Sequence, residues 1–227
     1  MRLGLTALAL TDHDGFYGVV RFAEAARVHG LPTVFGSELP WMRHPLRISP
    51  WGARTGTPDP SATHLVVLAA DPIGYARLGT AIAESQLAGE KGPPGSHQTV
   101  WPNWPARIHA GRPHRLSKGA VPAALAADGP MAARRALDDL VDRFGPQRVV
   151  VELWDHGHPS DVERNDALAT LAAKAAVGLV VTNNVHYHRP TRRRLATTMA
   201  AVRARRPWRN WTGGSQRPGD GPPAFGC

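Results

Sequence analysis

The sequence has little cysteine and no long apolar run. Its single cysteine, Cys227, is the last of 227 residues, which excludes a disulfide framework and a cysteine-rich zinc module. No run of about 18 apolar residues occurs, and the first residues lack the charged-then-apolar build of a signal peptide. We therefore expect a cytoplasmic protein with neither a membrane span nor an export signal.

Lysine is also scarce, because it accounts for only three of the 27 basic residues. The basic residues outnumber the 18 acidic ones, which leaves a net charge of +9. A basic surplus favours anionic partners such as nucleic acid, although net charge governs association rather than fold. With 42% hydrophobic residues, the chain has room for one α/β domain or for part of a larger protein, and disorder throughout is not expected.

Short apolar runs alternate with helix-like stretches along the chain. We predict strands at Leu5–Leu10, Pro32–Phe35, Leu65–Ala69, Arg148–Leu153 and Leu179–Thr182. We predict helices at about Tyr17–His29, Pro72–Ala88, Pro130–Phe144, Asp161–Ala176 and Thr191–Arg206. Continuous Val/Leu/Ala strands separated by helices of a dozen or more residues indicate a parallel sheet covered by helices, which is the α/β class.

Polar side chains follow four of the predicted strands, at the carboxyl ends where the active sites of parallel α/β folds lie. They are Asp12, His13 and Asp14, then Glu38, then Glu152, Asp155 and His156, and finally Asn183, Asn184, His186 and His188. Such nitrogen and oxygen ligands would suit Zn, Mn or Fe. Any one of these residues has a structural explanation, such as a helix cap for Asp12, but the whole set favours a metal site.

Three stretches carry a resemblance to a known family. They begin LTALALTDHDGF, THLVVLAADP and VELWDHGHP, and together they resemble the polymerase-and-histidinol-phosphatase (PHP) domain that opens the error-prone, C-family bacterial DNA polymerases related to the polymerase III alpha subunit. The resemblance implies an incomplete, distorted (β/α)7 barrel with parallel strands. In the family this barrel binds up to three divalent metal ions (Zn, Mn or Mg), and it is a phosphoesterase or 3′–5′ exonuclease in some members and a scaffold in others.

The resemblance identifies four metal-ligand positions that this chain keeps. They are His13 in T-D-H, Glu38 in G-x-E, His64 at the start of H-L-x-x-L-A, and His186 in D-x-H. Asp12, Asp14, Glu152, His156 and His188 are expected near the site.

Other ligand positions depart from the family pattern. Asn184 stands at the aspartate of D-x-H, and Leu116 stands with Ser117 where a Cys or His ligand belongs. An H-x-H motif and a further aspartate would lie upstream of Met1. We therefore assign no catalytic residue, and we expect partial or no metal occupancy and a catalytically silent chain.

Three segments show neither a strand nor a helix period, at about residues 40–51, 95–117 and 207–227, and they hold six of the seven tryptophans. When they are back-translated, the stretches at 95–117 and 207–227 permit family-like text in another reading frame. The interpretation is a truncated and frameshifted copy of a polymerase gene. The expected organisation is a PHP-like domain over residues 1–206 without its first strand, with irregular stretches at 40–51 and 95–117 and a disordered tail at 207–227.

Three functions remain open at this point. The first is a silent PHP-domain fragment of an error-prone polymerase, which acts in the replication and repair of damaged DNA with DNA and accessory proteins as partners. The second is a free-standing metal-dependent PHP phosphoesterase or 3′–5′ exonuclease. The third is a non-catalytic DNA-binding module that uses Arg192, Arg193, Arg194, Arg203, Arg205 and Arg206. A solvated helix with arginines at its C-terminal end, where the helix dipole favours cations, accounts for the same residues.

Overall fold

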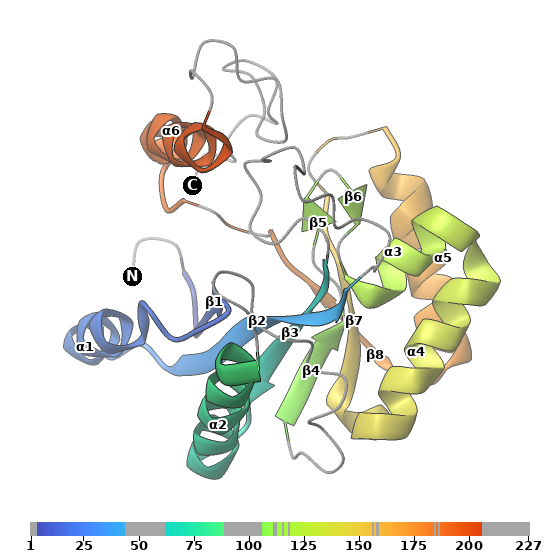
Figure 1. The fold of residues 1–227 in the computed structure, drawn as a ribbon, viewed down its shortest axis with the longest axis horizontal. Coiled ribbons are helices and arrows are strands. Elements are labelled where there is room, and N and C mark those ends of the chain that lie inside the picture. Colours follow the sequence, from blue (N-terminus) through green and yellow to red (C-terminus); the bar gives the residue numbers. More distant parts are fainter. Residues whose placement is uncertain are drawn as a thin grey trace.

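The computed structural model describes residues 4–43, 62–88, 106–110, 113–114, 116–117, 119–155, 157, 159–183, 185 and 187–205. Over these residues the chain forms a six-stranded sheet in the order β1-β2-β3-β4-β7-β8, with helices packed against it (Figure 1). No helix among them is long and apolar enough to cross a membrane. The sheet is the element that positions the candidate site.

The strands are β1 (Leu8–His13), β2 (Thr33–Arg43), β3 (Ala62–Ala69), β4 (Ala106–Ala110), β7 (Val149–Leu153) and β8 (Gly178–Val181), with a separate short pair, β5 (Pro113–His114) and β6 (Leu116–Ser117). The helices are α1 (Val19–His29), α2 (Pro72–Ala88), α3 (Ala120–Asp128), α4 (Pro130–Phe144), α5 (Asp161–Lys174) and α6 (Arg193–Ala204). Two 3-10 turns, η3 (Pro146–Arg148) and η4 (Pro190–Arg192), precede β7 and α6.

Local sequence signals set the ends of several helices. Helix α1 ends at Gly30, which adopts a left-handed conformation with φ of 61° that only glycine takes at little cost. Asp71 caps α2, because its side-chain oxygen accepts the N–H of Gly74 at 2.6 Å, and Pro72 occupies the first helical position. The predicted helix at Pro130–Phe144 is confirmed in full as α4.

The strands do not all run in one direction. β1 pairs with β2 in parallel, and β4, β7 and β8 pair with one another in parallel, whereas β3 is antiparallel to both β2 and β4. The α/β class and the parallel strands are confirmed, and the antiparallel β3 is a difference. A strand buried on both faces has the same continuous apolar run in either direction, so the LVVLA pattern does not report its orientation.

Two segments that were predicted to be irregular contain strands. β2 continues through Trp41 to Arg43, and residues 106–117 contain β4, β5 and β6. β4 lies between β3 and β7, with Ile108 opposite both Val67 and Val149, so this segment does fill the sheet. The prediction failed because the β4 sequence, ARIHA, contains arginine and histidine and is not a continuous apolar run like β7 or β8, and its place is fixed by backbone pairing on both sides. Residues 207–227 lie outside the described residues, and the domain boundary at 206 stays a prediction.

Trp41 belongs to the core. Its side chain is 2% exposed, and its ring lies 5.9 Å from that of Phe144 on α4. The Arg143 guanidinium stands 5.6 Å from the Trp41 ring centre. The same core cluster joins leucines and valines of β2, β3 and β7 to α2, α3, α4 and α5.

We predict that Trp41→Ala destabilises the protein by about 3–5 kcal/mol, because it removes a large buried aromatic and leaves a cavity. Tyr17→Ala is the matched control: Tyr17 is 80% exposed, and its truncation is expected to change stability by about 0.5 kcal/mol or less. Urea unfolding of the two variants measures the difference. Equal effects would show that Trp41 does not contribute to the core as described.

Candidate metal centre at the strand ends

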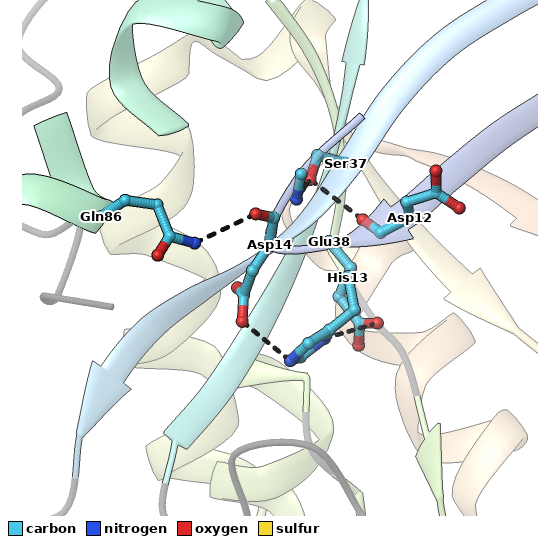
Figure 2. Close-up of polar contacts among 7 residues, drawn as sticks. Asp12, His13, Asp14, Ser37, Glu38 and Gln86 are labelled. Carbon is cyan, nitrogen blue, oxygen red and sulfur yellow. Dashed lines mark hydrogen bonds and ion pairs between the residues drawn. The ribbon is translucent and has the colours of Figure 1, made fainter. Parts of the chain in front are cut away.

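His13, the last residue of β1, lies opposite Glu38 in the middle of β2. His13 Nδ1 is 3.3 Å from Glu38 Oε2, and His13 Nε2 is 3.0 Å from Asp14 Oδ2. Figure 2 shows the His13 ring between the two carboxylates. Both ring nitrogens of His13 therefore contact a carboxylate oxygen.

His64 completes a cluster of three predicted ligand residues. It lies on β3, is almost completely buried, and its ring centre is 4.8 Å from that of His13. The pairing of β1, β2 and β3 thus gathers His13, Glu38 and His64, which are 51 residues apart in the chain at most. A backbone bridge also joins His64 to Gly119. Leu116 and Ser117 come shortly before Gly119 in the chain. The side chains of Leu116 and Ser117 lie outside the described residues.

Backbone and hydroxyl groups hold the loop after β1 in place. The buried Ser37 hydroxyl donates to the Asp12 carbonyl at 3.0 Å and accepts the Gly15 N–H at 3.2 Å. The Asp14 N–H donates to the Glu38 carbonyl at 2.9 Å, and the Gln86 side-chain amide of α2 donates to the Asp14 carbonyl at 3.2 Å (Figure 2). These bonds fix where the Asp14 carboxylate meets His13. Neither Ser37 nor Gln86 carried a sequence signal that pointed to this role.

Asp12 does not face the cluster. Figure 2 shows its carboxylate directed away from His13. Its Oδ2 accepts the N–H of Gly18 at 2.6 Å, immediately before α1. This is the helix-start role that the sequence left open as the structural alternative for Asp12.

The carboxylates raise the pKa of His13. Burial by itself would lower it, because a charged imidazolium loses hydration in the interior. Hydrogen bonding and charge attraction from Asp14 and Glu38 outweigh burial and raise the pKa from 6.5 to about 9. His13 is therefore a protonated imidazolium at neutral pH, and it balances one of the two carboxylate charges.

The remaining predicted residues lie elsewhere in the fold. Glu152 is buried near the end of β7, on the other side of β4 from the cluster, and it accepts a hydrogen bond from the Thr182 hydroxyl after β8. Asp155 accepts the Gly157 N–H at 2.7 Å, and His188 is exposed. His156, Asn184 and His186 lie outside the described residues, so their predicted proximity to the cluster stays a prediction.

Arg164 anchors the loop that follows β7, a role that the sequence did not indicate. Its Nη1 donates to the Asp161 carboxylate at 2.5 Å, and its Nη2 donates to the Trp154 carbonyl at 2.7 Å. The guanidinium also lies 4.0 Å from the Trp154 ring centre. The Asn165 side chain donates to the same carbonyl at 2.8 Å. The start of α5 is thereby tied to the end of β7.

The described residues do not by themselves form a complete metal site. A histidine ligand offers a nitrogen lone pair to the metal, but in this arrangement both nitrogens of His13 face carboxylate oxygens, at 3.0 and 3.3 Å. Over the described part of the chain, no group of three or more His, Cys, Asp or Glu side chains is placed to hold one ion. Of the four residues that the resemblance gave as ligands, His13, Glu38 and His64 come together, and His13 pairs with the carboxylates beside it.

We predict that the stabilising effect of His13 depends on pH. Because its folded pKa is about 9 and its unfolded pKa about 6.5, the contribution is fully present below pH 6.5 and is lost as the pH rises through 9. The unfolding free energies of the wild type and His13→Gln should differ most near pH 6, by the order of 2–3 kcal/mol, and converge near pH 10. His188→Gln, at an exposed histidine, is the control. A difference that does not change with pH would contradict the ion-pair account.

We predict that Arg164→Leu destabilises the protein by about 3 kcal/mol or more, because it removes the cation beside the buried Asp161 carboxylate. Arg134→Leu is the matched control. Arg134 contacts Asp138 at 2.8 Å, but both side chains are more than one third exposed, so we expect a cost below about 1 kcal/mol. Urea unfolding separates the two cases, and an equal loss of stability in both variants would refute the anchoring role.

Comparison with known proteins is consistent with the sequence resemblance. Residues 1–156 match the PHP domain family. The error-prone DNA polymerase of Mycobacterium tuberculosis is 52% identical over 209 residues, and that of Nocardia farcinica is 40% identical over 246 residues. These matches cover 90% and 91% of this chain but only 18% and 21% of the relatives, so the chain spans about a fifth of their length.

A solved structure shares the fold. It comes from Bifidobacterium adolescentis, is assigned as a metal-dependent phosphoesterase, and matches with a TM-score of 0.51 over 83% of this chain and 80% of its own. At 16% sequence identity this likeness speaks for the fold alone. Together with the match over residues 1–156, it leads to one conclusion: the chain belongs to the PHP domain family.

Proposed function

We propose that this chain is the PHP domain of an error-prone DNA polymerase and that the domain serves as a scaffold without metal-dependent phosphoester chemistry. The relatives named error-prone DNA polymerase, at 52% and 40% identity, support the first part. The whole polymerase would work on damaged DNA in the cytoplasm, together with accessory proteins. The PHP domain would contribute a folded module to it.

One observation carries the second part of the proposal, namely the contact of both His13 nitrogens with carboxylates. A metal-dependent phosphoesterase needs a divalent ion to lower the pKa of a bound water to about 7 and to neutralise phosphate oxygens. The protonated His13 has no free lone pair with which to accept a proton, so it is also a poor general base. The departures at Leu116 and Asn184, which the family resemblance identifies as ligand positions, support the same conclusion.

The cluster still has a structural use. His13, Asp14 and Glu38 join β1 to β2, and His64 brings β3 against them. The imidazolium offsets buried negative charge that would otherwise destabilise this end of the sheet. A scaffold needs this cohesion, whereas a hydrolase needs an open coordination position.

A free-standing phosphoesterase is the second candidate. The fold likeness to the protein assigned as a metal-dependent phosphoesterase favours it, and His13, Glu38 and His64 are residue types that could bind such an ion after rearrangement. The two candidates differ in one measurable property, which is metal-stimulated hydrolysis by the purified chain.

We also propose that the reading frame changes within the gene at the segments that lack a period. The family-like text permitted in other frames around residues 98, 112 and 207 supports this. The ordered β4 shows that part of one such segment is nevertheless compatible with the sheet. Sequencing the locus from upstream of Met1 to beyond Cys227 tests the idea, and codons that cannot encode family text in any frame would overturn it.

We predict no stimulation of bis(p-nitrophenyl) phosphate hydrolysis by Mn²⁺ or Zn²⁺ in the wild-type chain. The double variant Leu116→Cys with Asn184→Asp supplies two ligands that the family pattern calls for, and we expect it to bind Mn²⁺ at least tenfold more tightly in calorimetric titration. Leu116→Cys with Asn183→Asp is the matched control, because it adds the same charge one position away. Metal-stimulated turnover by the wild type that is abolished in His13→Ala would instead establish the phosphoesterase.

A further inference from the structure

The positive charge of this chain is concentrated in one segment. Residues 167–219 contain ten basic residues and no aspartate or glutamate. The rest of the chain holds 17 basic and 18 acidic residues and is nearly neutral. The net charge of +9 therefore comes from this segment, whose described part consists of the end of α5, β8, η4 and α6.

The arginines of this segment lie around η4 and α6. Arg189, Arg192 and Arg194 are exposed near the start of α6, and Arg205 is exposed at its end. Among the described residues, none of these four makes an ion pair with a carboxylate. The side chains of Arg203 and Arg206 lie outside the described residues. Figure 1 shows α6 apart from the sheet and from α4 and α5.

Three arginines of α4 and α5 have carboxylate partners. Arg134, Arg143 and Arg164 contact Asp138, Asp139 and Asp161 at 2.8, 2.9 and 2.5 Å. These three arginines of α4 and α5 are neutralised within the chain, whereas the four around α6 are not. A charge that is left without an internal counter-ion is available to an external one.

Helix stability does not account for the arginines near the start of α6. The helix begins at Arg193, so Arg192, Arg193 and Arg194 stand at its N-terminal end, where the helix dipole disfavours cations. The first turn holds no acidic residue that would offset this. Attraction to the helix dipole therefore explains the arginines at the C-terminal end of α6, such as Arg205, but not those at its N-terminal end.

The shape of α6 suits contact along its outer side. Thr197 and Ala201 are buried, whereas Leu195, Met199 and Val202 are exposed. Twelve residues span about 18 Å, so the arginines at the two ends of α6 are separated by more than the roughly 12 Å width of the DNA major groove. Arginines spaced in this way can reach phosphates on both sides of a groove.

We propose that the surface formed by η4 and α6 binds the phosphate backbone of DNA through Arg189, Arg192, Arg194 and Arg205. This proposal rests on the proposed function, because it takes the polyanion to be the DNA on which an error-prone DNA polymerase acts. An anionic membrane would also attract arginines, but the described outward face of α6 offers only three large apolar side chains, none of them aromatic. The contacts would go to phosphates, so binding should not depend on base sequence.

Fluorescence anisotropy with a labelled 30-base-pair duplex of arbitrary sequence, titrated with the full chain between 50 and 200 mM NaCl, tests the proposal. The triple variant Arg189→Gln, Arg192→Gln and Arg194→Gln should bind at least tenfold more weakly. Its slope of log affinity against log salt should become shallower by about 0.9 for each phosphate that the variant no longer neutralises. The matched control is Arg21→Gln, Arg27→Gln and Arg135→Gln, three exposed arginines on α1 and α4, which lowers the net charge equally. Circular dichroism verifies that both variants are folded.

The control variant should keep most of the wild-type affinity and salt slope. An equal weakening in the two variants would mean that only net charge matters and would overturn the site. Binding to phosphatidylglycerol vesicles without binding to the duplex would overturn it as well, in favour of a membrane surface. Hydrolysis of bis(p-nitrophenyl) phosphate reports separately on the proposed function, because neither variant alters His13, Glu38 or His64.

Discussion

The parallel register of β1 and β2 determines the candidate site. It sets His13 opposite Glu38, and a shift by one residue would turn one of these side chains to the other face of the sheet. Gly36 makes the adjoining pairing with β3 possible, because a Cβ at this position would lie 2.4 Å from the Val67 carbonyl oxygen. The glycine and the glutamate of G-x-E therefore have distinct roles: the glycine permits the close approach of β3, and the glutamate two residues later reaches His13.

Charge balance at this end of the sheet depends on His13 and its two carboxylate neighbours. Two carboxylates that are this close together need a positive charge between them. His13, whose pKa is raised to about 9, lies between them and supplies that charge. In our proposal of a scaffold, this pairing compensates the carboxylates without a metal ion.

The sequence predicted features that have strong local signals and missed those that depend on distant partners. Asp71 marked the start of α2 and Gly30 the end of α1, because caps act within one turn. The short β4 is defined by its neighbours, and the direction of β3 was not predictable because its side-chain pattern is the same either way. In the site, motif resemblance gave the ligand-type residues that the sheet brings together. The resemblance did not give the orientation of Asp12, whose carboxylate is held by the N–H of Gly18. It also did not give the role of Ser37, whose hydroxyl donates to the carbonyl of Asp12 on the neighbouring strand.

The two charged regions of the domain differ in how strongly salt screens their charges. Where the end of β1 pairs with β2, opposite charges lie within about 3 Å of one another in a partly buried setting, where salt screens them little. Around α6 the charges are of one sign and exposed, so their effect extends into solvent and weakens as salt is added. The first arrangement uses its charge for internal cohesion, and the second leaves its charge exposed to solvent, which is what our proposals of a scaffold and of a phosphate-binding surface require.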